Sequence, residues 1–85
     1  MIKLFISSKA RDCKACETAR KYLKFNHFKY KEIDIVKNRD EANKMFKKTS
    51  QLILPQLEIA GEMVIGFNLN RIAEILNNLI EEKSK

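Results

Sequence analysis

The chain contains few of the residues that break regular structure, with two glycines and one proline among 85 residues. That scarcity excludes collagen-like and low-complexity chains. Apolar residues make up 45% of the sequence and charged residues 33%, a balance typical of a small globular protein and not of a disordered one. The length allows one hydrophobic core, so we expect a single domain over residues 1–85.

Long uncharged stretches are also missing. No run approaches the ~20 apolar residues that a membrane-spanning helix needs, so we expect no membrane contact. The amino-terminal run Leu4-Phe5-Ile6 is too short for the core of a secretory signal peptide, and no small-residue cleavage site follows it. We therefore expect a cytoplasmic protein. In that reducing compartment the two cysteines would not form a permanent structural bridge.

Acidic residues are outnumbered, since 17 Lys and Arg stand against 11 Asp and Glu and give a formal charge of +6. Such a surplus can attract nucleic acid or an acidic partner. The basic residues are scattered, so we interpret them first as solvated faces of helices and strands. A positive surface that helps an acidic partner to approach is the second interpretation. A nucleic-acid site rests on charge alone, and we expect no nucleic-acid partner.

The hydrophobic periodicity predicts one α/β unit. A right-handed crossover makes the first two strands parallel, and a hairpin around Ala60-Gly61-Glu62 adds two antiparallel strands. We expect the order β-α-β-α-β-β-α, a four-stranded mixed sheet with three helices that cover both of its faces. Strands are predicted over residues 2–7, 30–35, 56–59 and 63–65, and helices over 14–26, 39–49 and from an Asn68 cap onward. The stripe of the last helix consists of Ile72, Ile75, Leu76, Leu79 and Ile80.

The other two predicted helices have apolar stripes as well. In the helix over 14–26 the stripe contains Cys16, Ala19 and Leu23, and Glu17 can pair with Arg20 on the outer face. In the helix over 39–49 the stripe contains Ala42, Met45 and Phe46.

The sequence Cys13-Lys14-Ala15-Cys16 carries the chemistry. It follows the first predicted strand and opens the first predicted helix, where free backbone N–H groups and the helix dipole stabilise a negative charge. The pKa of the Cys13 thiol should therefore fall below the free value of ~8.5. Cys16 lies one turn further in, on the inner face, close enough to form a disulfide with Cys13. This spacing predicts an attacking thiol at Cys13 and a shielded, resolving thiol at Cys16.

Charges beside the pair act in opposite directions. Lys9, Arg11 and Lys14 would lower the pKa of Cys13 further. Asp12 would raise that pKa, or would instead cap the helix. We expect the three positive charges to outweigh the one negative charge.

Other interpretations of the two cysteines stay open. A zinc site within one chain needs about four ligands, whereas this chain has one pair and a lone His27. Two chains together would supply four thiols to a shared metal or iron–sulfur cluster. Two inert core cysteines are disfavoured because Lys14 lies between them. We expect His27 at the end of the first helix without a catalytic role, and we expect no metal or organic cofactor.

Three features in this order resemble the glutaredoxins of the thioredoxin superfamily, over essentially the whole chain. The Cys-x-x-Cys follows the first strand, Leu54-Pro55 stands where the family has a cis-proline, and Gly61 to Phe67 is similar to the family's hairpin and glycine turn. The resemblance implies a thioredoxin-like, glutaredoxin-type fold and a thiol–disulfide oxidoreductase that carries electrons. It also implies a cis bond before Pro55 and a substrate chain that pairs with the backbone of Leu54 beside Cys13.

Several positions depart from the family's glutathione-binding pattern. The family commonly has Pro-Tyr between the cysteines, where this chain has Lys14-Ala15. It has two glycines and then two acidic residues where Gly66-Phe67 and Leu69-Asn70 stand, and a basic residue where Ala10 stands. Each change removes or displaces a group that would hold glutathione. The Gly66-Phe67 turn instead resembles the redoxins that thioredoxin reductase reduces and that serve ribonucleotide reductase.

We therefore predict a monomeric, cytoplasmic dithiol–disulfide oxidoreductase. Its substrate would be a disulfide-bearing protein, for which the resemblance suggests ribonucleotide reductase, and its electron donor would be thioredoxin reductase. The alternatives are a glutathione-dependent glutaredoxin and a metal or iron–sulfur module bridged by two chains. The predicted catalytic pair is Cys13 and Cys16, and the predicted substrate-binding residues are Lys14, Leu54, Pro55, Gly66 and Phe67.

Overall fold

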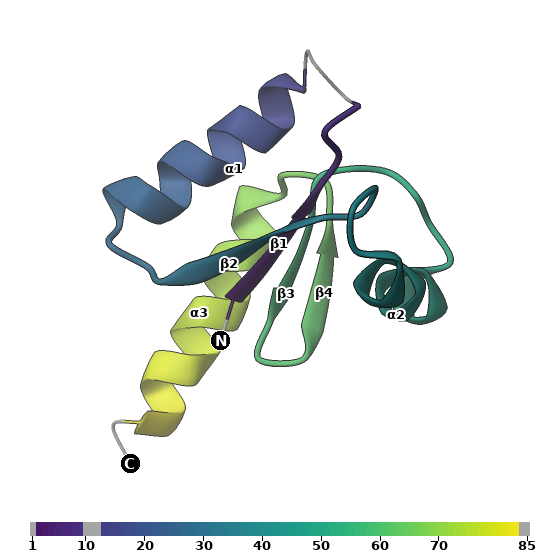
Figure 1. Cartoon of the computed structure of the whole chain (residues 1–85). Coiled ribbons are helices and arrows are strands. Elements are labelled where there is room, and N and C mark those ends of the chain that lie inside the picture. Colours follow the sequence, from purple (N-terminus) through teal and green to yellow (C-terminus); the bar gives the residue numbers. More distant parts are fainter. Residues whose placement is uncertain (1, 10–12, 84–85) are drawn as a thin grey trace.

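The computed structural model describes residues 2–9 and 13–83, with side chains up to residue 79 (Figure 1). The chain forms the predicted order of elements, and each begins or ends within one residue of its predicted bound. The elements are β1 (Ile2–Ile6), α1 (Lys14–Phe25), β2 (Tyr30–Asp34), α2 (Arg39–Thr49), β3 (Gln56–Ile59), β4 (Glu62–Ile65) and α3 (Leu69–Lys83).

The four strands form one mixed sheet in the order β2-β1-β3-β4. β1 pairs in parallel with β2 and antiparallel with β3, and β3 pairs antiparallel with β4. As an inner strand with helices on both faces, β1 needs apolar residues on both of its faces. Leu4 and Phe5 point to opposite faces, and both are buried. The expected thioredoxin-like arrangement of sheet and crossovers is therefore confirmed.

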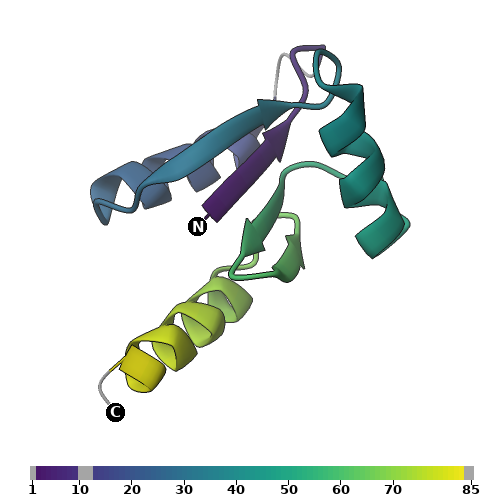
Figure 2. The ribbon, with the colours of Figure 1, turned by 60° about the horizontal axis from the view of Figure 1, so that its bottom comes forward.

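Two hydrophobic clusters lie on the two faces of the sheet. One face packs against α1 and α3, and the other against α2; Figure 2 shows α2 set apart from the other two helices. Leu54, in the connection from α2 to β3, packs against both clusters. The first cluster contains Ile2, Leu4, Ile6, Cys16, Ala19, Leu23, Leu57, Ile59, Val64, Ile72 and Ile75, and the second contains Phe5, Ile33 and Met45.

The helix ends follow local capping rules. The Asn68 side chain accepts a hydrogen bond from the Arg71 N–H at 3.1 Å, so the predicted cap of α3 is confirmed. Asn38 caps α2 in the same way through the Glu41 N–H at 3.2 Å. Of the predicted stripe of α3, the Ile80 side chain lies outside the described residues, whereas Ile72 is fully buried. None of the described helices has the length and apolar character that crossing a membrane requires.

Two side-chain expectations need correction. Phe46 was expected on the buried stripe of α2, but its side chain is 45% exposed, while Met45 beside it is 1% exposed. Successive helical residues point about 100° apart, and Met45 takes the direction that faces the sheet. Arg20 was expected to pair with Glu17 along α1. It instead donates to Glu32 of β2 at 2.6 Å, so its guanidinium ties the helix to the edge strand.

A group of charged side chains covers the α2 face of the sheet. Lys3 of β1 lies 3.3 Å from a Glu41 carboxylate oxygen and 3.8 Å from one of Glu58. Lys48 of α2 donates to Glu58 as well. This hydrogen bond and the nearby positive charges of Lys48 and Lys3 lower the pKa of the Glu58 carboxyl below its usual value, although partial burial opposes the shift. The ionised form of Glu58 therefore helps to hold α2 on the sheet.

Glu58→Gln should remove an acid-dependent part of the stability. Because the pKa of Glu58 is lower in the folded protein than in the unfolded chain, its contribution is present above about pH 4.3 and fades as the pH falls through the folded pKa. We expect a loss of about 0.5–1 kcal/mol at pH 7, the size of a well-placed surface ion pair, and little loss at pH 3. Urea unfolding at both pH values measures this. Glu74→Gln, which neutralises an exposed carboxylate elsewhere, is the control; an equal loss at pH 3 would contradict the assignment.

Candidate active site

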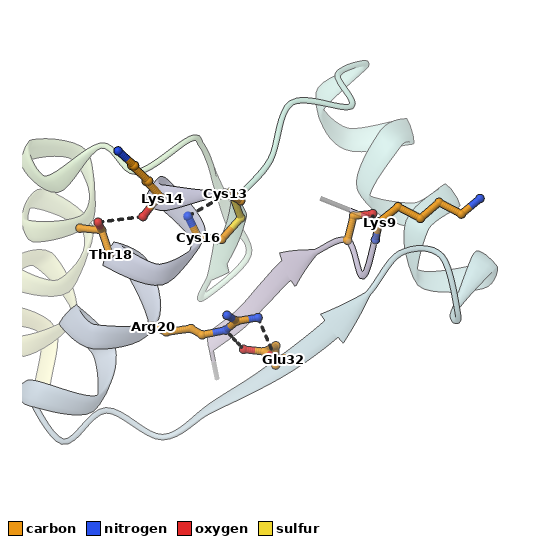
Figure 3. Close-up of a disulfide and its surroundings, with 8 residues drawn as sticks. Lys9, Cys13, Lys14, Cys16, Thr18, Arg20 and Glu32 are labelled. Carbon is orange, nitrogen blue, oxygen red and sulfur yellow. Dashed lines mark hydrogen bonds and ion pairs between the residues drawn. A yellow bond between two sulfur atoms is a disulfide. The ribbon is translucent and has the colours of Figure 1, made fainter. Parts of the chain in front are cut away.

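Cys13 and Cys16 are joined by a disulfide at the amino-terminal end of α1 (Figure 3). Their Cα atoms lie 5.2 Å apart, within the range that such a bond requires. The proximity expected from the spacing of the two cysteines is therefore confirmed. The chain has no other cysteine, so all of its thiol chemistry is concentrated at this helix end.

Cys13 itself is the N-cap of α1. Its backbone is extended, with φ −82° and ψ 91°, and its Sγ accepts a hydrogen bond from the Cys16 N–H at 3.2 Å. Its carbonyl oxygen accepts the Glu17 N–H, also at 3.2 Å. The sulfur thus occupies the place of the oxygen in an ordinary cap. Asp12, the alternative cap considered from the sequence, lies outside the described residues.

The two sulfurs differ in burial. Cys16 is 4% exposed and belongs to the first hydrophobic cluster with Ala19 and Leu23, as its position on the stripe predicts. Cys13 is half-buried and packs against that cluster without belonging to it. In the reduced protein, a substrate disulfide would therefore meet Cys13 first.

The described lysines near the pair do not contact it. In Figure 3 the side chains of Lys9 and Lys14 extend away from the disulfide, and both residues are exposed. The Lys14 carbonyl accepts the Thr18 hydroxyl at 2.9 Å, which supports the first turn of α1. Solvent screens the charges of these exposed side chains, so the helix end is the stronger influence on a Cys13 thiolate. Ala10 and Arg11, also singled out above, lie outside the described residues.

Pro55 connects two of the loops expected around the site. The Leu54–Pro55 peptide bond is cis, as the family resemblance implied, and the Pro55 side chain is fully buried. The Pro55 carbonyl accepts the Gly66 N–H at 2.7 Å. Gly66 has φ +73°, a conformation that glycine adopts without strain. The segment before β3 and the turn after β4 are therefore bound to each other.

Phe67 contacts α1 as well as the turn. Its ring meets Tyr22 edge-on with centroids 5.8 Å apart, and it packs against the first cluster, as do Leu54 and Cys13. Phe67 was predicted from the sequence as a substrate-binding residue, whereas Tyr22 was not predicted. The available signal was its spacing, because Tyr22 follows Ala19 by three positions and so lies near the same helix face.

Sequence reasoning also missed two polar side chains. Asp34, at the end of β2, accepts the Ser8 N–H at 3.2 Å and the Val36 N–H at 2.9 Å. Desolvation tends to raise the pKa of Asp34, but these hydrogen bonds outweigh it and the pKa is lowered. Asp34 thereby fixes the start of the loop that leads from β1 to Cys13. Gln56, directly after Pro55, is fully buried.

Metal ligands are few around the disulfide. In the part of the chain that the structure describes, no three side chains of His, Cys, Asp or Glu gather closely enough to hold an ion. Cys13 and Cys16 would supply two thiolates, so the described residues would need ligands from elsewhere to complete a site.

The comparisons with known proteins agree with this geometry. The model of the glutaredoxin family matches residues 2–64, a region that includes both cysteines and Pro55. The chain belongs to the glutaredoxin family. It is thus a redox-family protein with a thioredoxin-like fold and a Cys-x-x-Cys pair at Cys13 and Cys16.

Three relatives illustrate this membership. An uncharacterised glutaredoxin-like 8.6 kDa protein in the rubredoxin operon of Clostridium pasteurianum is 24% identical over 76 residues, 89% of this chain and 97% of that protein. A mutant of the thioredoxin-like protein BC3987 is 28% identical with a TM-score of 0.77, covering 89% of this chain and 94% of that one. The glutaredoxin-like NrdH-redoxin from Escherichia coli shares the fold, with a TM-score of 0.72, 16% identity and coverage of 86% and 91%.

The difference in burial predicts which thiol reacts first. In reduced protein, limiting iodoacetamide should modify Cys13 before Cys16 between pH 4 and 9, because only Cys13 combines access with a stabilised thiolate. The apparent pKa of its alkylation rate should lie below the ~8.5 of a free thiol. Peptide mass spectrometry reads out the order. The same reaction in 8 M urea is the control and should lose the preference; modification of Cys16 first in the folded protein would reverse the assignment.

Proposed function

We propose that this protein is a dithiol–disulfide oxidoreductase that reduces protein disulfides and carries the electrons between a reductase and its substrate. The observation that carries the proposal is the Cys13 sulfur, which caps α1 and accepts the Cys16 N–H, beside a buried Cys16. This arrangement favours a thiolate at the accessible sulfur and a thiol at the shielded one. The remaining steps follow from that difference.

The reaction transfers two electrons in two exchanges. The Cys13 thiolate attacks one sulfur of the substrate disulfide; a mixed disulfide forms, and the other substrate sulfur leaves as a thiolate that takes up a proton. Cys16 then loses its proton and attacks the Cys13 Sγ, which releases the second substrate thiol. The protein is left with the Cys13–Cys16 disulfide seen here. A donor that supplies two electrons and two protons restores the dithiol.

The Cys16 N–H contributes to the first exchange. It lies 3.2 Å from the Cys13 Sγ, so it stabilises negative charge on that sulfur when Cys13 is the nucleophile. In any exchange in which Cys13 is the leaving group, the same N–H stabilises the departing thiolate. The resolving residue therefore contributes a backbone donor as well as a thiol.

The surface near Pro55 suits a protein substrate. Leu52 and Ile53 are 65% and 57% exposed, and Leu69 at the start of α3 is 47% exposed. Within the described part of the chain, the backbone of residues 52–54 makes no hydrogen bond, so Leu54 can offer its N–H and C=O to an extended substrate chain. Lys14, Gly66 and Phe67 would complete the contact surface.

The residues that open α3 favour thioredoxin reductase over glutathione as the donor. The first turn of α3 contains no acidic residue, and Leu69 and Asn70 stand where a glutathione-binding relative would have an acidic pair. The two remaining candidates are a glutathione-dependent glutaredoxin and a metal or iron–sulfur module bridged by two chains. We place the protein in a reducing, cytoplasmic compartment, and ribonucleotide reductase is the first protein substrate to test.

The choice of donor can be measured directly. With NADPH and thioredoxin reductase, the protein should reduce insulin disulfides with saturable kinetics, whereas glutathione with its reductase should give a kcat/KM lower by about tenfold or more, since each missing charge contact is worth ~1 kcal/mol. Leu69→Asp/Asn70→Asp, which restores the acidic pair, should improve the glutathione reaction. Comparable rates with both donors for the unaltered protein would favour the glutathione-dependent alternative. A coloured protein with bound iron would favour the cluster alternative.

Replacing Cys13 and replacing Cys16 should affect disulfide exchange in different ways. Cys13→Ser should abolish disulfide exchange, because a serine hydroxyl does not attack sulfur at neutral pH. Cys16→Ser should still attack and then stop at the mixed disulfide, which a non-reducing gel detects as an adduct with ribonucleotide reductase or another substrate. Cys13→Ser/Cys16→Ser is the control for non-specific association. Turnover by Cys13→Ser would contradict the proposed roles.

A further inference from the structure

Gln56 is a polar side chain in an apolar position. It is 0% exposed and begins β3 opposite Phe5 of β1, on the face of the sheet that packs against α2. Its Nε2 donates to the Gln51 carbonyl at 2.8 Å. Its Oε1 is buried and has no partner among the described residues. Buried amide oxygens normally have a hydrogen-bond partner. The hydrogen bond from Nε2 to Gln51 is therefore formed at the cost of leaving the buried Oε1 unsatisfied.

The contact holds the beginning of the segment that leads to Pro55. This 51–54 segment connects α2 to β3, and the backbone of residues 52–54 makes no hydrogen bond within the described part of the chain. Packing of Leu54 and the buried Pro55 hold its far end. Its near end is held at Gln51, whose carbonyl accepts the Gln56 amide and whose N–H donates to the Thr49 Oγ1 at 3.3 Å.

Thr49 is the other neighbour of that carbonyl, and it cannot replace Gln56. The Thr49 Oγ1 lies 3.3 Å from the Gln51 oxygen and 3.2 Å from the Met45 oxygen. A hydroxyl has one proton and can donate to only one of these carbonyls at a time. The Gln56 Nε2 lies closer to the Gln51 oxygen, at 2.8 Å, and makes no other hydrogen bond among the described residues. Gln56 is therefore the main side-chain donor to this carbonyl.

We propose that Gln56 is a positioning residue for protein substrates: by fixing the Gln51 carbonyl, it sets the path of residues 52–54, whose free backbone meets the substrate chain beside Cys13. The inference rests on the proposed function. Gln56 touches neither the cysteines nor the substrate, so it should affect how well a protein chain is held and not how sulfur reacts. A small disulfide, which does not need the segment, should be insensitive to it.

Gln56→Met removes the amide, keeps a similar volume and deletes the unsatisfied oxygen. The KM for insulin disulfides should rise about fivefold to tenfold, the equivalent of one hydrogen bond, while kcat and the reaction with bis(2-hydroxyethyl) disulfide stay within about twofold. The melting temperature should not fall, because an apolar side chain is favoured in a buried apolar site. Dithiothreitol serves as the reductant, so the result does not depend on which enzymatic donor is correct.

Two variants provide the controls. Asn43→Ala removes an exposed polar side chain of α2, outside the segment, so it should leave the KM for insulin unchanged. Thr49→Val should have a small effect alone and a larger one in the Gln56→Met background, because both side chains hold the Gln51 backbone. An unchanged KM for insulin in Gln56→Met, or equal losses on both disulfides in parallel with a lower melting temperature, would overturn the proposal. Failure of the unaltered protein to reduce either disulfide would instead refute the proposed function.

A spectroscopic measurement on the unaltered protein covers the case in which Gln56→Met does not fold. The Nε2 protons of Gln56 should exchange with solvent at least about tenfold more slowly than those of the exposed Gln51 side chain, because they are buried and one is bonded. Exchange of the two side chains at similar rates would show that the Gln51 carbonyl is not held and would overturn the proposal.

Discussion

The antiparallel pairing of β1 with β3 is the constraint on which the site depends. In this register Phe5, next to the end of β1, lies opposite Gln56 at the start of β3. Gln56 in turn lies opposite Ile65 at the end of β4. The loops that carry the cysteines, Pro55 and Gly66 therefore lie at the same end of the sheet, although Cys13 and Gly66 are 53 positions apart in the sequence. A shift of one residue in the pairing register of a strand would turn its paired side chain, such as Phe5, Gln56 or Ile65, to the other face of the sheet.

Much of this arrangement could be predicted from the sequence, because the deciding patterns are local. Helical spacing assigned Cys16 to the buried face, and the position of the pair after a strand assigned Cys13 to the helix end. The cis bond before Pro55 came from the family resemblance, since local chemistry favours a trans bond.

The side chains that escaped prediction depend on contacts between distant elements. Gln56 has a polar side chain and would be expected at the surface, yet it is buried and its amide donates to the Gln51 carbonyl in the connection from α2. Arg20 had an acidic partner available within its own helix, yet the parallel pairing of β1 and β2 brought Glu32 within reach. The contact of Tyr22 with Phe67 likewise joins residues from opposite ends of the chain. Spacing along the chain indicates which face of the helix carries Tyr22, but the partner that each of these side chains meets follows from the topology.

The disulfide closes a very small ring, because Cys13 and Cys16 are three positions apart. A cross-link stabilises a protein chiefly by reducing the conformational freedom of the unfolded chain, and that effect grows with the length of the loop it closes. Forming or breaking this bond therefore changes the freedom of the unfolded chain less than a bond between more distant cysteines would. Most of the first hydrophobic cluster comes from residues other than the two cysteines. In the redox cycle proposed above, the tendency of the chain to unfold would thus vary less between the oxidised and the reduced protein than it would with a bridge that closed a long loop.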